Sequence, residues 1–344
     1  MSKNTTSNLH SQNIIACVWD FDKTLIPGYM QAPIFDYFNI DSSTFWKEVN
    51  QLPEVYKKRG ITVSKDTVYL NHLLNYVKNG ALKGLSNAKL KELGQGLEFY
   101  SGLPHFFKEL QDLVKTNFEY AKHGITLEHY IISTGLAAMI RGSVIAQYVD
   151  GIYGCEFVEN PLGPGFSLQK DFDLEHDAEI SQIGVMVDNT IKTRFIFEIN
   201  KGSNKNPEID VNSKMRDEDR RIPIRNMIYI ADGPSDVPVF SVVKNHGGKT
   251  FAVYDPDNEE EFAQNDALLQ SGRIHAYGPA NYSAGSASSM WIKMHVDKIS
   301  QRIVKERLQT LEERLSKPPI HLQSKEKKEE EKAEKFDYQQ ADLI

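Results

Sequence analysis

The chain has 344 residues, with 40 Lys and Arg against 47 Asp and Glu, so its formal net charge is −7. This balance does not favour a basic nucleic-acid-binding protein. A content of 40% hydrophobic and 10% aromatic residues suffices for a sizeable core and argues against global disorder. At about 150 residues per domain, the length predicts two domains.

The cysteine content and the N-terminal segment bear on the compartment. Cys17 and Cys155 lie far apart and form no CxxC motif, so we predict neither a disulfide framework nor a cysteine metal site. The segment MSKNTTSNLHSQ contains no apolar run of the kind a secretory signal needs. No stretch reaches the about 18 consecutive apolar residues of a membrane-spanning helix. We therefore expect a cytoplasmic protein.

The first predicted element is a buried strand, and a helical insertion follows it. Residues 14–19 (IIACVW) form an apolar run typical of a strand that is buried on both faces of a parallel sheet. Residues 27–101 contain no such run, and Ser64 and Ser86 precede helical patterns as candidate N-caps. We predict a second, smaller, mostly helical domain at 27–101.

Strand and helix signals alternate after this insertion. Further apolar runs, each closed by a small or polar residue, lie at 130–132, 183–187 and 227–231. The first helical pattern among them, at four-residue spacing, consists of Leu136, Ile140, Val144 and Tyr148. The alternation predicts an α/β fold with a doubly wound parallel sheet, formed by a discontinuous core of residues 13–26 and 102–315.

The other segments are polar or lie near the C-terminus. Residues 201–225 carry many charges together with Gly and Pro, which predicts a loop or hairpin excursion. Apolar residues from Met290 to Leu315 recur at helical spacing and predict a helix packed on the core. Residues 316–344 include KEKKEEEKAEK and predict a charged, disordered C-terminal tail, for which a solvated helix is the alternative.

Acidic side chains follow two of the predicted strands. Asp20 and Asp22 come after the first strand, in DFDKT, and Asp232 and Asp236 come after the strand at 227–231, in DGPSD. Ligands bind at the carboxyl ends of strands in open α/β sheets. Like charges so close are costly unless a cation or a shared proton compensates them. A turn cap beside a solvated acid is the alternative interpretation of the first pair.

Two further polar groups lie between these acidic pairs. Ser133, Thr134 and Gly135 follow the strand at 130–132, where a hydroxyl and backbone N–H groups can hold a phosphate oxygen; an ordinary helix N-cap is the alternative. Lys192 opens a predicted helix, where a cation is unfavourable because the helix dipole is positive there. An anion close to Lys192 would explain its position.

In this order, DFDKT at 20–24, Ser133, Lys192 and DGPSD at 232–236 resemble the four motifs of the haloacid dehalogenase-like (HAD) superfamily. The insertion at 27–101 resembles the helical cap of the phosphoserine-phosphatase-like branch. The resemblance therefore implies an HAD-type core with a cap domain. The fourth motif departs from the familiar pattern at Ala231, where Gly is commoner.

The resemblance implies a role for each matching residue. Asp20 would be the nucleophile that takes the phosphoryl group, and Asp22 the general acid and base. Ser133 and Lys192 would be the other catalytic residues. The substrate phosphate would be bound by Ser133, Thr134, Gly135 and Lys192.

The resemblance also implies Mg²⁺ as the cofactor. Its ligands would be the Asp20 carboxylate, the Asp22 backbone carbonyl and the Asp232 carboxylate, all hard oxygens of the kind that this ion prefers. Asp236 would either orient a metal-bound water or pair with Lys192, and both alternatives stay open.

These inferences predict a Mg²⁺-dependent phosphatase that hydrolyses a small soluble phosphomonoester through an aspartyl-phosphate. The expected partner is a small phosphorylated metabolite, with no nucleic acid and no membrane. A phosphotransferase with the same site and a non-catalytic HAD-fold module that binds phosphate-bearing partners are the alternatives. Candidate substrate contacts are Tyr29, Tyr56, Arg59, Tyr69, Arg141 and Lys170.

Overall fold

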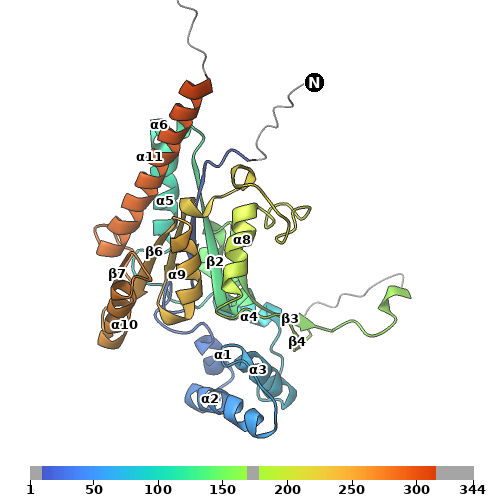
Figure 1. The fold of residues 1–344 in the computed structure, drawn as a ribbon. Coiled ribbons are helices and arrows are strands. Elements are labelled where there is room, and N and C mark those ends of the chain that lie inside the picture. The colour runs from blue at the N-terminus through green and yellow to red at the C-terminus, as the bar shows by residue number, and fades with distance from the viewer. Residues whose placement is uncertain (1–9, 169–177, 315–344) are drawn as a thin grey trace, which may run out of the picture. The chain divides into compact units, whose positions relative to one another are not determined.

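The structure, a computed structural model, describes residues 10–168 and 178–314 (Figure 1). A sheet in the order β4-β3-β2-β1-β5-β6-β7 forms its centre. β3 and β4 pair antiparallel, and all other neighbours pair parallel. The strands are β1 (Ile14–Trp19), β2 (Thr126–Leu136), β3 (Gly151–Glu159), β4 (Ile180–Val185), β5 (Met227–Ala231), β6 (Lys249–Tyr254) and β7 (Ala276–Pro279). This mostly parallel sheet confirms the predicted α/β fold.

β1 lies in the middle of the sheet because its side chains are apolar on both faces. It pairs with β2 from Ile14 onward and with β5 from Ala16 onward. Every residue from Ile15 to Trp19 is buried. A strand without a polar face is stable where other elements cover both sides. The parallel strands all end at one edge of the sheet, where Asp20 follows β1 and Asp232 and Asp236 follow β5.

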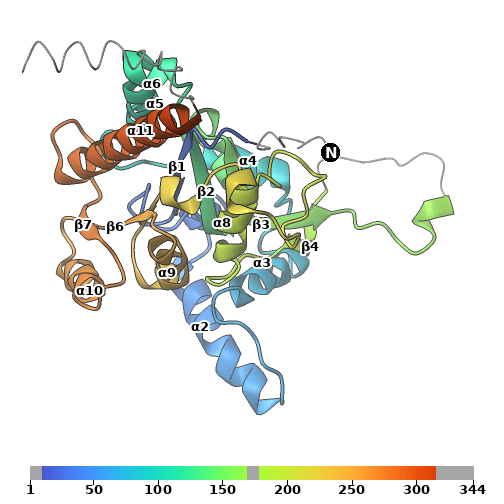
Figure 2. The same ribbon diagram turned by 45° about the horizontal axis from the view of Figure 1, so that its top comes forward.

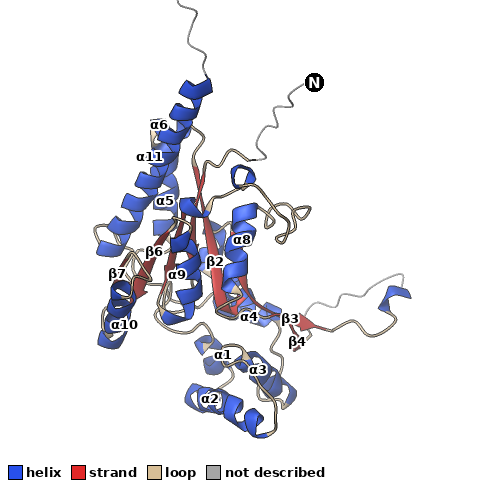
Figure 3. Ribbon diagram, viewed as in Figure 1, coloured by secondary structure: helices blue, strands red, loops and turns tan. Residues whose placement is uncertain are grey.

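Helices cover both faces of the sheet (Figure 3). On one face, α5, α7 and α11 pack against Ile15, Cys17 and Trp19 of β1, and on the other α8 and α9 pack against Ala16 and Val18. The α-helices are α1 (Ala32–Tyr37), α2 (Ser42–Lys58), α3 (Val68–Lys78), α4 (Asn87–Gly94), α5 (His105–Thr116), α6 (Phe118–Lys122), α7 (Ala137–Gly142), α8 (Lys192–Lys201), α9 (Val237–Asn245), α10 (Glu259–Gln270) and α11 (Ala287–Arg314). None of the helices within the described ranges is long and apolar enough to cross a membrane.

The chain divides after Val304, within α11, into two compact units. In the first unit α11 lies beside α5 and α6 (Figure 2). Lys293 of α11 pairs with Glu109 of α5, and the Tyr120 hydroxyl of α6 donates a hydrogen bond to Asp297. On one face of α11, the apolar residues Ile292, Val296, Ile299 and Ile303 are buried on the core. The helix predicted from Met290 therefore exists and packs on the core as expected, while the tail at 316–344 lies outside the described residues.

The segment 27–101 contains α1 to α4 and no strand among its residues, all of which are described. The Ser86 hydroxyl caps α4 by accepting a hydrogen bond from Lys89 N at 3.1 Å, as predicted. The cap predicted at Ser64 is wrong, because α3 begins later, at Val68, and follows Thr67. That this segment is a separate cap domain stays a prediction.

Two glycines let α4 pack closely on α7. A Cβ atom on Gly94 would lie 2.0 Å from the Met139 carbonyl oxygen, and one on Gly142 would lie 1.8 Å from that of Lys91. Real Cβ contacts are never this short, so any larger side chain would push the two helices apart. This contact joins the insertion to the element that follows the second motif.

One strand prediction is wrong in position and environment. The apolar run at 183–187 indicated a strand buried in a parallel sheet, whereas β4 spans Ile180–Val185, runs antiparallel and lies at the edge of the sheet. Most of its side chains are at least partly exposed, including Val185 at 40%. Apolar composition alone does not distinguish an edge strand from a central one, because the distinction depends on what packs against it.

The helix expected from Leu136 to Tyr148 is also interrupted. β2 continues through the second motif to Leu136, α7 ends at Gly142, and a 3₁₀ helix (Val144–Tyr148) follows. The apolar residues keep their four-residue spacing across the break at Ser143, so the sequence pattern did not indicate that the helix is interrupted there. The polar segment 201–225, described throughout, consists of turns and short 3₁₀ helices after α8 and contains no strand.

Candidate active site

Asp20 is fixed where β1 ends. Its backbone N–H donates to Ile230 O at 2.9 Å, which holds it beside the end of β5. The chain then turns: Leu25 N donates back to Phe21 O at 2.8 Å, and Lys23 adopts a left-handed conformation with φ of 57°. The Thr24 hydroxyl donates to Asp20 Oδ2 at 3.3 Å. The turn thus holds a carboxylate that is only 5% exposed.

Lys192 joins two of the motifs. It is the first residue of α8 and is 1% exposed, and its Nζ lies 2.7 Å from both Asp20 Oδ1 and Asp236 Oδ1. Burial by itself lowers the pKa of a lysine, but the charges of Asp20 and Asp236 raise the Lys192 pKa above its ordinary value. These carboxylates explain a cation at a helix N-terminus.

The fourth motif contributes two acids in different surroundings. Asp236 is fully buried and accepts hydrogen bonds from Lys192, the Tyr229 hydroxyl and, at 2.8 Å, the Ser235 hydroxyl. The Asp232 carboxylate accepts no hydrogen bond from the residues that the structure describes. Burial, followed by the charge of Asp20, raises its pKa well above the ordinary range. The structure thus pairs Asp236 with Lys192 and leaves Asp232 available to a ligand.

Asp22 has the surroundings of a protonated acid. Its Oδ1 accepts a hydrogen bond from Met30 N at 2.9 Å, and no cation pairs with it among the described residues. Burial, followed by the charge of Asp20, raises the pKa of Asp22 to about 8. At neutral pH this carboxyl group therefore keeps its proton while Asp20 faces Lys192.

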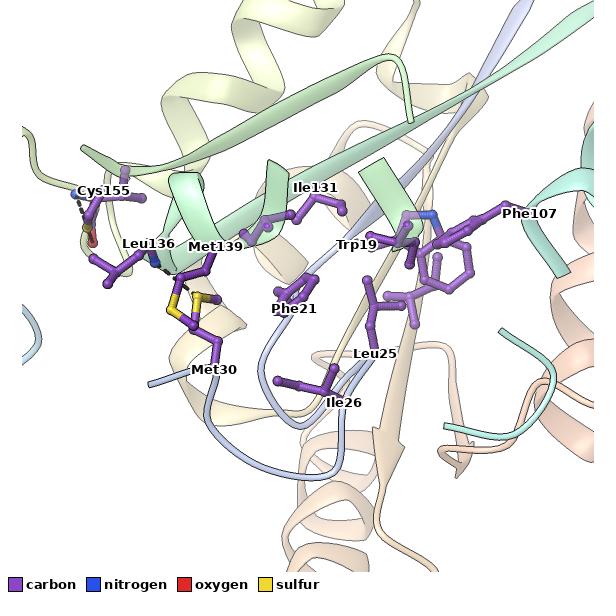
Figure 4. Packing of buried hydrophobic residues seen from close by; sticks show 14 of the residues in the cluster. Trp19, Phe21, Leu25, Ile26, Met30, Phe107, Ile131, Leu136, Met139 and Cys155 are labelled. Carbon is purple, nitrogen blue, oxygen red and sulfur yellow. Dashed lines mark hydrogen bonds between the residues drawn. The ribbon is translucent and has the colours of Figure 1, made fainter. Parts of the chain in front are cut away.

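Met30 connects the first motif to the second (Figure 4). Its N–H holds Asp22, and its sulfur accepts a hydrogen bond from Leu136 N at 3.0 Å. The Met30 side chain is fully buried against Gly135, where a Cβ atom would lie 2.3 Å from Met30 Cε. A larger residue at position 135 would therefore displace the Met30 side chain, and the first residues of the insertion contact the strand that carries Ser133.

The second motif is built differently from the first. Ser133 is 1% exposed, and its hydroxyl accepts a hydrogen bond from Gly135 N at 2.9 Å. Thr134 lines the cavity described below, whereas Ser133 and Gly135 do not. The Thr134 carbonyl accepts a hydrogen bond from the Tyr69 hydroxyl of α3 at 2.7 Å, so the insertion also contacts this motif.

Three carboxylates could together hold a metal ion. Ligand oxygens of Asp20, Asp232 and Asp236 lie within 4.8 Å of one another. Lys192 is the one buried cation among them, so the cluster carries an excess of negative charge. Burial raises the pKa of Asp20 and of Asp232, and the neighbouring carboxylates raise both further. Hard oxygen donors with excess negative charge suit Mg²⁺. The residues present therefore fit the ion that the sequence motifs imply.

A cavity of about 650 Å³ opens onto these residues. Asp20, Asp22, Lys192 and Asp232 line it from the core, together with Thr134. Among the candidate substrate contacts, Tyr29 and Tyr69 line it as well, whereas Tyr56 and Arg59 do not. Arg141 pairs with Glu156 instead, and Lys170 lies outside the described residues.

Several cavity residues were not predicted from the sequence. Lys23 belongs to the first motif, and its Nζ lies 3.0 Å from Glu261 Oε1 of α10. Gln31, Trp46, Glu261 and Gln264 line the cavity from elements far apart in the chain. The position of Lys23 within DFDKT could have indicated that it lies at the site. No feature of the sequence alone indicates that the other four residues line the cavity.

No protein-family model matches the chain. A protein described as uncharacterized, from Borreliella burgdorferi (strain ATCC 35210 / DSM 4680 / CIP 102532 / B31), is 39% identical over 285 residues, which are 82% of this chain and 96% of that protein.

Solved structures with similar folds include an HAD-family hydrolase and two phosphoserine phosphatases. The hydrolase, from Salmonella enterica subsp. enterica serovar Typhi, is 15% identical at a TM-score of 0.44, over 77% of this chain and 66% of that one. A phosphoserine phosphatase with a phospho-aspartyl intermediate analogue is 13% identical (TM-score 0.42; 77% and 93% covered). A probable phosphoserine phosphatase from Vibrio cholerae is 12% identical (TM-score 0.45; 85% and 68%). At such low scores, the functional assignment rests on the motifs and the site geometry.

Proposed function

The chain belongs to one family with the uncharacterized Borreliella burgdorferi protein and, by its four motifs, to the haloacid dehalogenase-like superfamily. From this premise we propose that it is a phosphatase of small phosphomonoesters. The observation that carries the proposal is the pair formed by Asp20 and Asp22. One carboxylate faces Lys192 at 2.7 Å, the other is uncharged at neutral pH, and both line the same cavity.

In the proposed reaction, an Asp20 oxygen attacks the phosphorus atom of the ester. The bond from phosphorus to the leaving oxygen breaks, and the proton on Asp22 passes to that oxygen, which leaves as the alcohol. The ionised Asp22 then takes a proton from water, whose oxygen attacks phosphorus and releases Asp20 and inorganic phosphate. The raised pKa of Asp22, about 8, supports this role because the acid must carry its proton before the first step.

Lys192 stabilises the charge that gathers during the reaction. Its ammonium group pairs with Asp236 and with Asp20, the carboxylate that receives the phosphoryl group in the proposed reaction. Phosphoryl transfer depends mainly on positioning and on neutralisation of charge, which a fixed buried cation provides. The Tyr229 and Ser235 hydroxyls fix Asp236, so Lys192 has little freedom to move away.

Mg²⁺ would be held by the carboxylates of Asp20 and Asp232 and by the backbone carbonyl of Asp22. When bound, it neutralises the charge of the nucleophile and of the phosphate. Two features of the Asp232 carboxylate support its proposed role as a ligand: it accepts no hydrogen bond from the described residues, and its pKa is raised.

Release of inorganic phosphate from a panel of phosphomonoesters tests the proposal. We expect release that requires Mg²⁺, stops with EDTA, and is lost in Asp20→Asn, which keeps the size of the side chain but not its nucleophilic carboxylate. Retention of most of the activity by Asp20→Asn would contradict the mechanism. Phosphate binding without release from any ester would instead indicate a non-catalytic module.

A further inference from the structure

Three aromatic side chains, Tyr29, Trp46 and Tyr69, line the cavity from the insertion. The Trp46 ring is a neighbour of both the Tyr29 and the Tyr69 ring, with centroids 5.9 Å away in both cases and interplanar angles of 41° and 44°. Its other ring neighbours, Phe35 and Phe45, are both inclined at 85°. No ring among the described residues therefore stacks parallel on the indole, although Trp46 lines the cavity.

One face of α2 is directed at this cavity. Trp46, Val49 and Asn50 all line it, and their spacing of three and four residues places them on the same side of a helix. Val49 is 4% exposed and adds apolar surface, while Asn50 adds a side chain that can both donate and accept hydrogen bonds.

Gln31 also lines the cavity from the insertion. It directly follows Met30, whose N–H holds Asp22, and it is 3% exposed. Its Oε1 has no hydrogen-bond partner among the residues that the structure describes. A buried amide oxygen without a donor is costly, so a ligand that supplied an N–H or O–H here would be bound favourably.

The two ends of the cavity differ in chemistry. Most of the charged residues that line the cavity come from the core, whereas the insertion contributes aromatic rings and amides together with Lys65 and Asp66. A volume of about 650 Å³ lies within the range that encloses ligands of drug size, far larger than a phosphoryl group alone. The room at the insertion end therefore belongs to the organic group of the substrate.

Resting on the phosphatase function proposed above, we propose that the substrate is a phosphomonoester whose organic group carries a planar ring with an N–H or O–H donor. The ring stacks on Trp46, and the donor is accepted by Gln31 Oε1. Stacking on an aromatic face and removal of the ring from water both favour such an ester over one without a ring.

Matched esters test this inference without changing the leaving group. Adenosine and cytidine 5′-monophosphates share their primary alcohol with ribose 5-phosphate, and 2-(4-hydroxyphenyl)ethyl phosphate shares its own with ethyl phosphate. We expect kcat/KM at least about tenfold higher for a ring-bearing member than for its ringless partner, a ratio within reach of one stacked and buried ring.

Variants separate stacking from general damage. Trp46→Leu should lower kcat/KM for the ring-bearing ester about tenfold and leave the ringless ester unchanged, while Trp46→Phe retains most of the preference. Gln31→Leu should lower the same preference several-fold, and thermal unfolding of each variant checks that it folds. Equal kcat/KM within every pair, or an equal loss for both members in Trp46→Leu, would overturn this inference alone. No release from any ester would overturn the phosphatase function itself.

Discussion

The two carboxyl groups of the first motif, Asp20 and Asp22, differ in their surroundings and therefore in their protonation. Asp20 and Asp22 are separated by one residue, yet Asp20 lies 2.7 Å from a lysine and Asp22 receives a single backbone N–H. Burial therefore favours the protonated form of Asp22, whereas at Asp20 the charge of Lys192 offsets part of the same effect. Different environments give two identical side chains different proposed roles.

Asp22→Asn should lower the rate according to the leaving group of the substrate. Loss of a general acid costs about 10² to 10⁴-fold when the leaving alcohol is a poor one. An activated aryl phosphate needs little protonation, so its rate should fall much less. The ratio of kcat/KM for p-nitrophenyl phosphate and for an alkyl phosphate measures this difference, because kcat/KM reports the step in which the alcohol leaves, whereas kcat also includes hydrolysis of the aspartyl-phosphate, for which Asp22 is the proposed base. An equal loss for both esters would argue against Asp22 as the acid.

His129 should make the folded state sensitive to acid. Its Nδ1 accepts a hydrogen bond from Trp19 Nε1 at 3.2 Å, and its Nε2 lies 3.0 Å from the Phe107 carbonyl oxygen, so the neutral ring satisfies both partners. Burial lowers the pKa of His129 to about 3. Below the unfolded value of about 6.5, the unfolded chain binds a proton that the folded one does not, so stability falls as the pH falls.

Between pH 6.5 and 4.5 this residue should contribute a loss of about 2 kcal/mol in the free energy of unfolding. Urea titrations at several pH values of the natural protein and of His129→Asn measure it, with the difference between their pH slopes as the result. His129→Asn cannot titrate, so parallel slopes would show that His129 does not cause the effect.

At the scale of elements, the packing of α4 on α7 determines how the insertion meets the core. Both helices bring backbone into contact at a glycine, Gly94 in one and Gly142 in the other. The second motif lies directly before α7, and Met30 joins the start of the insertion to the same place. Movement of α4 would therefore also displace the segment 133–135, which is predicted to bind the substrate phosphate.

Gly94→Ala should destabilise the protein by about 1 to 3 kcal/mol, because the new methyl group would lie 2.0 Å from the Met139 carbonyl oxygen. Gly163→Ala is the matched control, since a Cβ atom there would have no atom within 4 Å. Chemical denaturation compares the two variants. A Gly94→Ala protein as stable as the control would show that α4 and α7 can separate at no cost.

At the scale of the whole molecule, the buried acids make stability depend on a bound cation. Asp20, Asp232 and Asp236 converge from two strands of the sheet, and Lys192 supplies one positive charge among them. The fold thus maintains a repulsion that a divalent ion would relieve. Ligand binding to the folded state alone raises stability by an amount that depends on concentration.

Mg²⁺ at about 100 times its dissociation constant should stabilise the protein by about 2.7 kcal/mol. Thermal unfolding with MgCl₂, compared with NaCl at equal ionic strength, measures the shift in melting temperature. Asp232→Asn should melt higher than the natural protein without metal, because it removes a carboxyl group whose charged form is disfavoured by burial and by Asp20, and it should lose most of the Mg²⁺ shift. An undiminished shift in this variant would place the ion elsewhere.

The sequence by itself determined the alternation of strands and helices, the helical segment after the first strand, and the order of Asp20, Asp22, Lys192, Asp232 and Asp236. These features follow from apolar periodicity and from residue types at strand ends, which are local properties. The roles of these residues and the cap domain at 27–101 stay predictions.

Only the tertiary structure decided which side chains meet. Lys192 finds Asp20 across 172 residues of sequence, and Lys23 finds Glu261 across 238. The sequence likewise did not predict that β4 lies at the edge of the sheet or that Trp46 lines the cavity. Pairing over such separations depends on strand order and on helix packing, and no local pattern in a single sequence records either.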